Sequence, residues 1–204
     1  MYRLVLTEPT HPCESLPVWV KITGDEDSAT RAGFDTGSTR IELGDGLFMY
    51  EDTRITVRQW EHDIDIRVGV IDGRLAAKEV CVRCHDASTA VTSEALRAIP
   101  VAGLVRHAAD AVQYVAGRHD GGAESIGPAW PNEEEGAYVA AHGLDDRTLK
   151  IVARVYRIAY LLGDSPTKKV ETVFDIPRST AGRWVSAARG RKYLSESRGA
   201  GKAG

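Results

Sequence analysis

The chain has 204 residues, of which 43% are hydrophobic and 27% charged, a composition typical of a folded protein with one or two domains. It holds no uninterrupted apolar stretch long enough to span a bilayer, and its first residues lack the basic start and apolar block of a secretory signal. Three cysteines without such a signal do not make a disulfide framework. We therefore expect a cytoplasmic protein with no membrane partner.

The formal net charge of −3 is unevenly distributed. Residues 1–144 carry 13 Lys and Arg against 23 Asp and Glu, whereas residues 145–204 carry 13 against 6. Segments of opposite sign indicate two modules with different partners. A basic segment of this size favours a polyanion, most often nucleic acid.

The first 85 residues contain short β-branched or aromatic runs separated by turn residues, which predicts an antiparallel sheet or small barrel. Apolar Ile55 and Val57 alternate with polar neighbours, and Asp72-Gly73 fits the tight turn of a hairpin. The expected strands are Tyr2–Thr7, Val18–Thr23, Thr39–Leu43, Arg54–Trp60, Ile64–Ile71 and Ala77–Val82.

Helical spacing of apolar residues over 93–117 predicts a helix that is capped by Ser93 and kinked or restarted at Pro100. Residues 118–144 are rich in Gly, Pro and Glu and are interpreted as a linker, with a short helix near Tyr138–Ala141. The predicted fold is α+β. It has an antiparallel β-rich domain with a packed helix over residues 1–117, this linker, and an all-α domain with a basic tail over residues 145–204.

The last 60 residues predict three helices. The first begins at Asp145-Asp146, where the carboxylates favour a helix N-terminus, and ends at Gly163. The second runs over Pro166–Phe174 after a Ser165 cap, and Asp175-Ile176-Pro177 separates it from a third helix that begins at Arg178. The expected inner positions are Leu149, Val152, Ala153, Tyr156, Ala159, Tyr160, Val170, Val173, Phe174, Ala181, Trp184, Val185 and Ala188.

A long helix, a short helix, a tight turn and a basic third helix form the pattern of a helix-turn-helix DNA-binding domain. The third helix is expected to enter the major groove, where Arg183 can bind guanine through two hydrogen bonds and Gly182 permits close approach. Lysines of the second helix and basic residues after the third suit the phosphate backbone. The candidate DNA-binding residues are Lys168, Lys169, Arg178, Ser179, Thr180, Gly182, Arg183, Ser186, Arg189, Arg191 and Lys192.

This segment resembles the helix-turn-helix of small regulators and uncharacterised proteins common in actinobacteria and their phages. The resemblance covers about a quarter of the chain, and Ser93–Ala108 more loosely resembles the stretch that precedes the motif in such proteins. The family has Ala where Glu171 stands and Gly where Asp175 stands. The matching residues are Pro166, Thr167, Lys168, Val170, Phe174, Ile176, Ser179, Thr180, Ala181, Arg183, Trp184, Val185, Ala188 and Arg189.

Cys81-Val82-Arg83-Cys84-His85 has haem-attachment spacing, but that chemistry requires export. A structural zinc site is the stronger alternative, with Cys81 and Cys84 joined by His85, Cys13 or His11, and ordinary thiols are the simplest interpretation. No phosphate loop or nucleophile pattern occurs, so no enzyme and no cofactor are expected.

The sequence thus predicts a sequence-specific DNA-binding protein, interpreted as a transcriptional regulator that acts on double-stranded DNA as a homodimer. Two alternatives stay open. In one, the acidic N-terminal domain binds a protein partner and the C-terminal helices only tether it. In the other, the protein is a phage DNA-packaging or recombination accessory.

Overall fold

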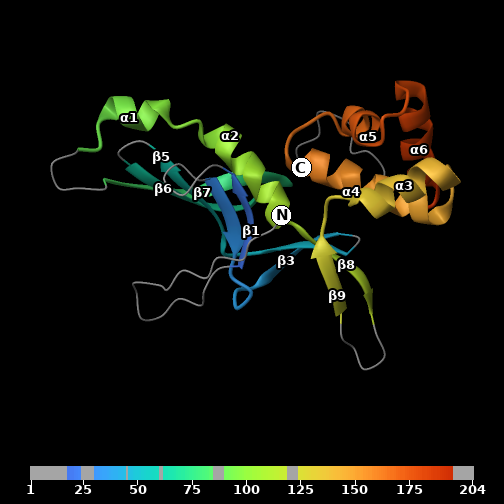
Figure 1. Ribbon diagram of the computed structural model, residues 1–204, viewed down its shortest axis with the longest axis horizontal. Coiled ribbons are helices and arrows are strands. Elements are labelled where there is room, and N and C mark those ends of the chain that lie inside the picture. The colour runs from blue at the N-terminus through green and yellow to red at the C-terminus, as the bar shows by residue number, and fades with distance from the viewer. Residues whose placement is uncertain are drawn as a thin grey trace. The chain divides into compact units, whose positions relative to one another are not determined.

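The computed structural model describes residues 18–23, 30–44, 46–59, 62–84, 90–118 and 124–194. The chain divides into two compact units, residues 1–129 and 130–204 (Figure 1). Over the described residues the fold is α+β, with two antiparallel sheets in the first unit and four helices in the second. The strand expected at Tyr2–Thr7 lies outside the described residues.

Five strands form the first sheet in the order β1-β2-β5-β6-β7. Its inner face consists of alternate residues, among them Ile55, Val57, Ile64, Ile66 and Val68, as the period of a half-buried strand requires. The strands are β1 (Val18–Thr23), β2 (Thr30–Phe34), β5 (Thr53–Gln59), β6 (His62–Ile71) and β7 (Arg74–Cys84).

The predicted hairpin at Asp72-Gly73 is confirmed. Both residues have positive φ, +51° and +72°, and Ile71 pairs with Arg74 across the turn. This is the geometry that matches the right-handed twist of a two-residue hairpin.

The second sheet has the order β3-β4-β8-β9. Of its strands, the sequence predicts only β3, as Thr39–Leu43. Its strands are β3 (Arg40–Gly44), β4 (Leu47–Tyr50), β8 (Gln113–Arg118) and β9 (Glu124–Pro128). Leu47, Phe48 and Met49 are consecutive in β4 and all are buried, so this strand lacks the alternation that identifies a strand in a sequence.

The helix expected over residues 93–117 is confirmed in part: it restarts at Pro100, as predicted, but helical structure ends at Ala111 and not at residue 117. The structure has α1 (Ser93–Ala98), α2 (Val101–Val105) and the 3-10 helix η1 (Arg106–Ala111), after which the chain enters β8. Thr92, not Ser93, caps α1, and its hydroxyl accepts a hydrogen bond from the Ala95 N–H. Leu104, Val105 and Ala108 pack on the inner face of the five-stranded sheet. The helical spacing of apolar residues therefore arises from this burial and does not require one continuous helix.

Residues 118–144, interpreted as a linker with a short helix near Tyr138–Ala141, contain β9 and the longer helix α3 (Glu133–His142), which includes the predicted helix. Asn132 caps α3 in a capping box with Glu135, which explains why an acidic triplet here starts a helix. The boundary between the units falls at Ala129–Trp130, so the acidic triplet belongs to the second unit. That unit therefore carries 13 Lys and Arg against 9 Asp and Glu, and the first unit 13 against 20.

The remaining helices have nearly the predicted bounds: α4 (Asp146–Leu161), α5 (Pro166–Phe174) and α6 (Arg178–Gly190). Asp145 caps α4 by accepting a hydrogen bond from the Thr148 N–H, and Pro166 occupies the first turn of α5. Ser165 is the N-cap residue of α5, but its side chain makes no capping hydrogen bond. Tyr160, expected on the inner face of α4, is 45% exposed.

Candidate nucleic-acid interface

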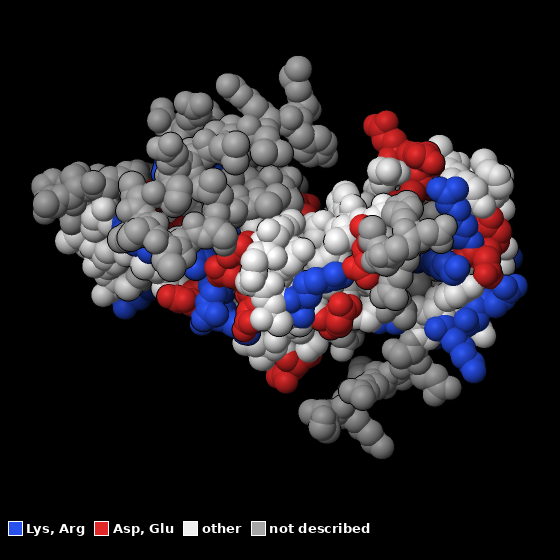
Figure 2. Space-filling view, turned by 90° about the horizontal axis from the view of Figure 1, so that it is seen from below, with Lys and Arg blue, Asp and Glu red and all other residues white. Residues whose placement is uncertain are grey.

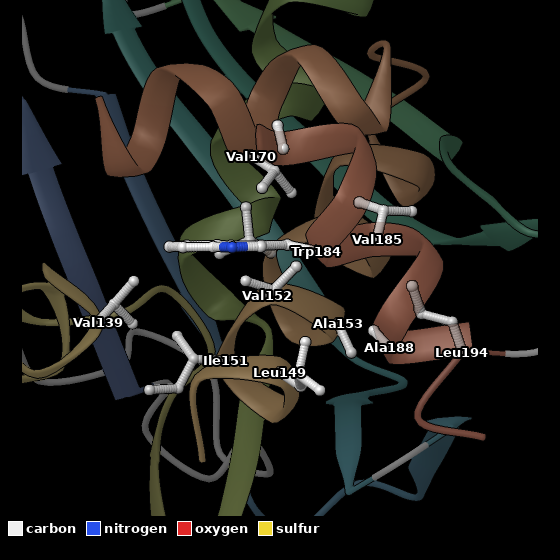
Figure 3. Packing of buried hydrophobic residues seen from close by; sticks show 12 residues of the cluster. Val139, Leu149, Ile151, Val152, Ala153, Val170, Trp184, Val185, Ala188 and Leu194 are labelled. Carbon is white, nitrogen blue, oxygen red and sulfur yellow. The ribbon is translucent and has the colours of Figure 1, made fainter. Parts of the chain in front are cut away.

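The core of the second unit fixes α6 against α4 and α5. Trp184 is 8% exposed, and Figure 3 shows its ring with Val170 of α5 on one side and Val152 of α4 on the other. Its ring also lies 6.4 Å from that of Phe174. Trp184 is therefore a core residue of the second unit, as its place in the apolar stripe of α6 predicts.

The turn between α5 and α6 consists of Asp175, Ile176 and Pro177. Asp175 adopts the left-handed conformation with φ +49° and ψ +48°, where many helices have Gly. The N–H groups of Asp175 and Ile176 both donate to the carbonyl of Glu171, and Ile176 packs against the core. The turn thus sets the direction of α6 through backbone hydrogen bonds and an apolar anchor.

The outer face of α6 is formed by short or basic side chains. Arg178, Ser179, Arg183 and Ser186 are exposed, whereas Thr180 and Gly182 are half-buried. A Cβ built on Gly182 meets nothing within 4 Å, so packing inside the protein does not require glycine there. This face therefore offers a shallow surface with one long side chain, Arg183, near its middle.

Several predicted basic residues are not engaged inside the protein. Within the described ranges, the side chains of Lys168, Arg178, Arg183 and Lys192 take part in no hydrogen bond or ion pair. Lys168 lies on α5, and Lys192 follows α6 with φ +62°. These four side chains keep their full hydrogen-bonding capacity for a ligand.

The other three predicted basic residues are held by neighbours. Lys169 Nζ lies 5.1 Å from the centre of the Trp130 ring. Arg191 forms an ion pair with Asp146, and Asp146 also accepts a hydrogen bond from the Tyr193 hydroxyl. Arg189 donates from Nη2 to the Tyr156 hydroxyl at 2.7 Å.

Sequence reasoning missed these aromatic and acidic neighbours. The sequence places Tyr156 on the inner face by its spacing alone, and it indicates no contact between a basic residue and Trp130 or Asp146. Their partners lie between 33 and 47 residues away along the chain. Such pairs depend on the tertiary packing of the second unit, and no local pattern signals them.

Glu171 has no Arg or Lys partner among the residues that the structure describes. Its side chain is half-buried on α5, and its carbonyl is engaged by the turn to α6. Neither Arg178 nor Arg183 is drawn away from the outer face of α6 to neutralise it.

The zinc alternative does not fit the strand geometry at Cys81 and Cys84. Both lie in β7, where Cys81 pairs with Asp65 and Cys84 with His62 in a register without a shift between them. Residues three apart on a regular strand point to opposite faces of the sheet, so the two thiols do not converge. The described residues contain no group of three metal-ligating side chains, and His11, Cys13 and His85 lie outside them.

The acidic side chains of β6 are paired with arginines on the outer face of the sheet. Asp63 lies 3.8 Å from Arg58, while Asp65 pairs with Arg83 and accepts a hydrogen bond from the Thr56 hydroxyl at 2.8 Å. The ion pair raises the pKa of Arg83, chiefly through its hydrogen bond to Asp65. These carboxylates therefore serve cross-strand pairing.

On the face drawn in Figure 2, Lys and Arg side chains are interspersed with Asp and Glu, so charge on that face is mixed. Among the described residues, no helix is both long and apolar enough to cross a membrane.

Comparison with known proteins finds no matching family, no matching curated protein and no matching solved structure.

Proposed function

We propose that this protein binds double-stranded DNA in the cytoplasm through α6 and acts as a sequence-specific transcriptional regulator. The observation that carries the proposal is the outer face of α6, where Arg178 and Arg183 stand without a partner in the described chain. The core around Trp184 and the turn at Asp175 hold that face in one orientation.

The chemistry of this face suits the major groove. A helix of this width fits the groove, and a guanidinium such as that of Arg183 can donate two hydrogen bonds to the O6 and N7 atoms of guanine. Ser179 and Thr180 add short hydroxyl side chains in the first turn. Lys168, exposed on α5, and Lys192 after α6 supply charge for phosphates on either side.

One such helix contacts few base pairs, so recognition of a site requires a second copy. The first unit, with 13 Lys and Arg against 20 Asp and Glu, does not itself attract DNA. We assign it to homodimer formation or to a protein partner.

The test uses the full chain and a randomised duplex library from which bound sequences are selected. Wild-type protein is expected to enrich a two-part site and to lose affinity steeply with salt. Arg183→Ala should relax base preference within each half-site at a cost of about 1–3 kcal/mol. Arg97→Ala, which removes the same charge from exposed α1 of the first unit, is the matched control and should leave the selected site unchanged.

Two outcomes favour the alternatives. If the wild-type chain binds no duplex at low salt, the acidic first unit makes a protein-interaction module the better assignment. If it binds duplex DNA without enriching any sequence, a DNA-packaging or recombination accessory fits better.

A further inference from the structure

The side chain of Arg189 is held in place before any ligand arrives. Its Nη2 donates to the Tyr156 hydroxyl at 2.7 Å, and its guanidinium carbon lies 5.2 Å from the centre of the same ring. Tyr156 is itself partly buried and packs against the core of the second unit. The two residues therefore connect the last turn of α6 to α4.

This connection leaves part of the guanidinium unused. The Nε atom of Arg189 is buried and makes no hydrogen bond within the described chain, while the contact with Tyr156 engages Nη2. An arginine has five N–H donors, so Nη1 and the second hydrogen of Nη2 remain for another acceptor. Burial of the stem and the hydrogen bond to Tyr156 restrict the directions in which they point.

Arg189 also lies at the edge of the proposed DNA-binding face. It follows Ser186 by three residues and Gly182 by seven, spacings that bring side chains to the same side of a helix. The inner face of α6 is formed by Ala181, Trp184, Val185 and Ala188, and Arg189 lies outside it. A guanidinium at this edge is suited to a backbone phosphate beside the groove and not to a base edge.

We infer that Tyr156 is a positioning residue for DNA binding, because it preorients Arg189 toward a phosphate of the bound duplex. This inference rests on the proposed function. Tyr156 touches no DNA in this arrangement, and its hydroxyl reduces the conformational freedom that Arg189 would otherwise lose on binding. Arg191 differs, since its ion pair with Asp146 already supplies the negative partner that a phosphate would replace.

The experiment measures affinity for a mixed-sequence duplex over a salt series with the full chain. Arg189→Ala should lower affinity and reduce the slope of log affinity against log salt by about one, because one phosphate contact is lost. Tyr156→Phe keeps the ring and removes only the hydroxyl. It should lower affinity by about threefold to tenfold and leave the slope unchanged, because the charge remains while its orientation is lost.

The double variant and a control separate positioning from a structural role. Tyr156→Phe should have no further effect on affinity in an Arg189→Ala background. Tyr160→Phe removes the exposed tyrosine hydroxyl of the same helix and should not change affinity. If wild type binds DNA but Tyr156→Phe binds equally well or more tightly, or alters only thermal stability, the inference is overturned. Absence of binding by wild type would instead refute the proposed function.

Discussion

The guanidinium of Arg154 on α4 forms an ion pair with the carboxylate of Glu135 on α3, and the Arg154 side chain is only 6% exposed. The same carboxylate accepts a hydrogen bond from the Asn132 N–H in the capping box of α3. One side chain thus serves both the start of α3 and its attachment to α4. Together with Val139, which is buried in the core of the second unit, this pair makes α3 an integral part of that unit.

Glu135→Ala should therefore destabilise the second unit by about 3 kcal/mol, because it removes both an ion pair of a buried arginine and the capping-box hydrogen bond to the Asn132 N–H. Glu134→Ala is the matched control. Glu134 is 82% exposed and lies 3.7 Å from Arg147, and exposed pairs of this kind contribute less than about 1 kcal/mol. Chemical denaturation followed by circular dichroism measures both changes. Equal effects of the two substitutions would show that the buried pair contributes nothing beyond the surface pair.

The role of α3 also predicts where the second unit can be separated from the first. A fragment of residues 130–204 keeps Glu135, Tyr138 and Val139 and should unfold cooperatively on heating. A fragment of residues 145–204 leaves Arg154 without its Glu135 partner and exposes the core position that Val139 fills. Its midpoint should be lower by about 10 °C or more. Identical melting curves for the two fragments would contradict this assignment of α3.

The accuracy of the sequence-based prediction follows from how local each signal is. The sequence predicts the bounds of α5 and the start of α6. Both are fixed by Pro166 and by the turn at Asp175–Pro177, and the geometry of these features depends only on adjacent residues. β4 is not predicted, because a fully buried Leu47–Met49 run has no period. α3 is predicted only as a short helix near Tyr138–Ala141, because Asn132 caps it within a segment that also contains Gly and Pro. At the candidate site, the exposed basic residues followed from helical spacing, whereas the contact between Arg189 and Tyr156 depends on the packing of α6 on α4.

The junction between α3 and α4 predicts a dependence of stability on pH. The Tyr138 hydroxyl donates to the carboxylate of Asp145, and this hydrogen bond, together with that from the Thr148 N–H, lowers the pKa of Asp145. The same bond raises the pKa of Tyr138. A carboxylate whose pKa is lower in the folded state stabilises that state above its unfolded pKa of about 4, and this stabilisation is lost as the pH falls further.

Tyr138→Phe removes this hydrogen bond while the Asp145 cap to Thr148 remains. The variant should be less stable than wild type at neutral pH, and the difference in free energy of unfolding should shrink as the pH falls below about 4. Urea denaturation at a series of pH values measures the difference. Tyr160→Phe, on an exposed position of α4, is the control for loss of a tyrosine hydroxyl. A difference that stays constant down to acid pH would exclude Asp145 as its origin.

Gly182 offers a test in which protein stability and DNA affinity should change in opposite directions. Its Cβ would meet no atom of the protein within 4 Å, and alanine is a better helix former, so Gly182→Ala should stabilise α6 by about 0.5–1 kcal/mol. If the outer face of α6 lies against DNA, the added methyl group holds the helix away from the groove and affinity should fall. Gly190→Ala, equally unobstructed but at the end of α6, is the matched control and should not lower affinity. Thermal denaturation and binding to the selected duplex measure the two effects. A Gly182→Ala variant that is more stable and binds DNA as tightly as wild type would show that α6 does not approach the duplex by this face.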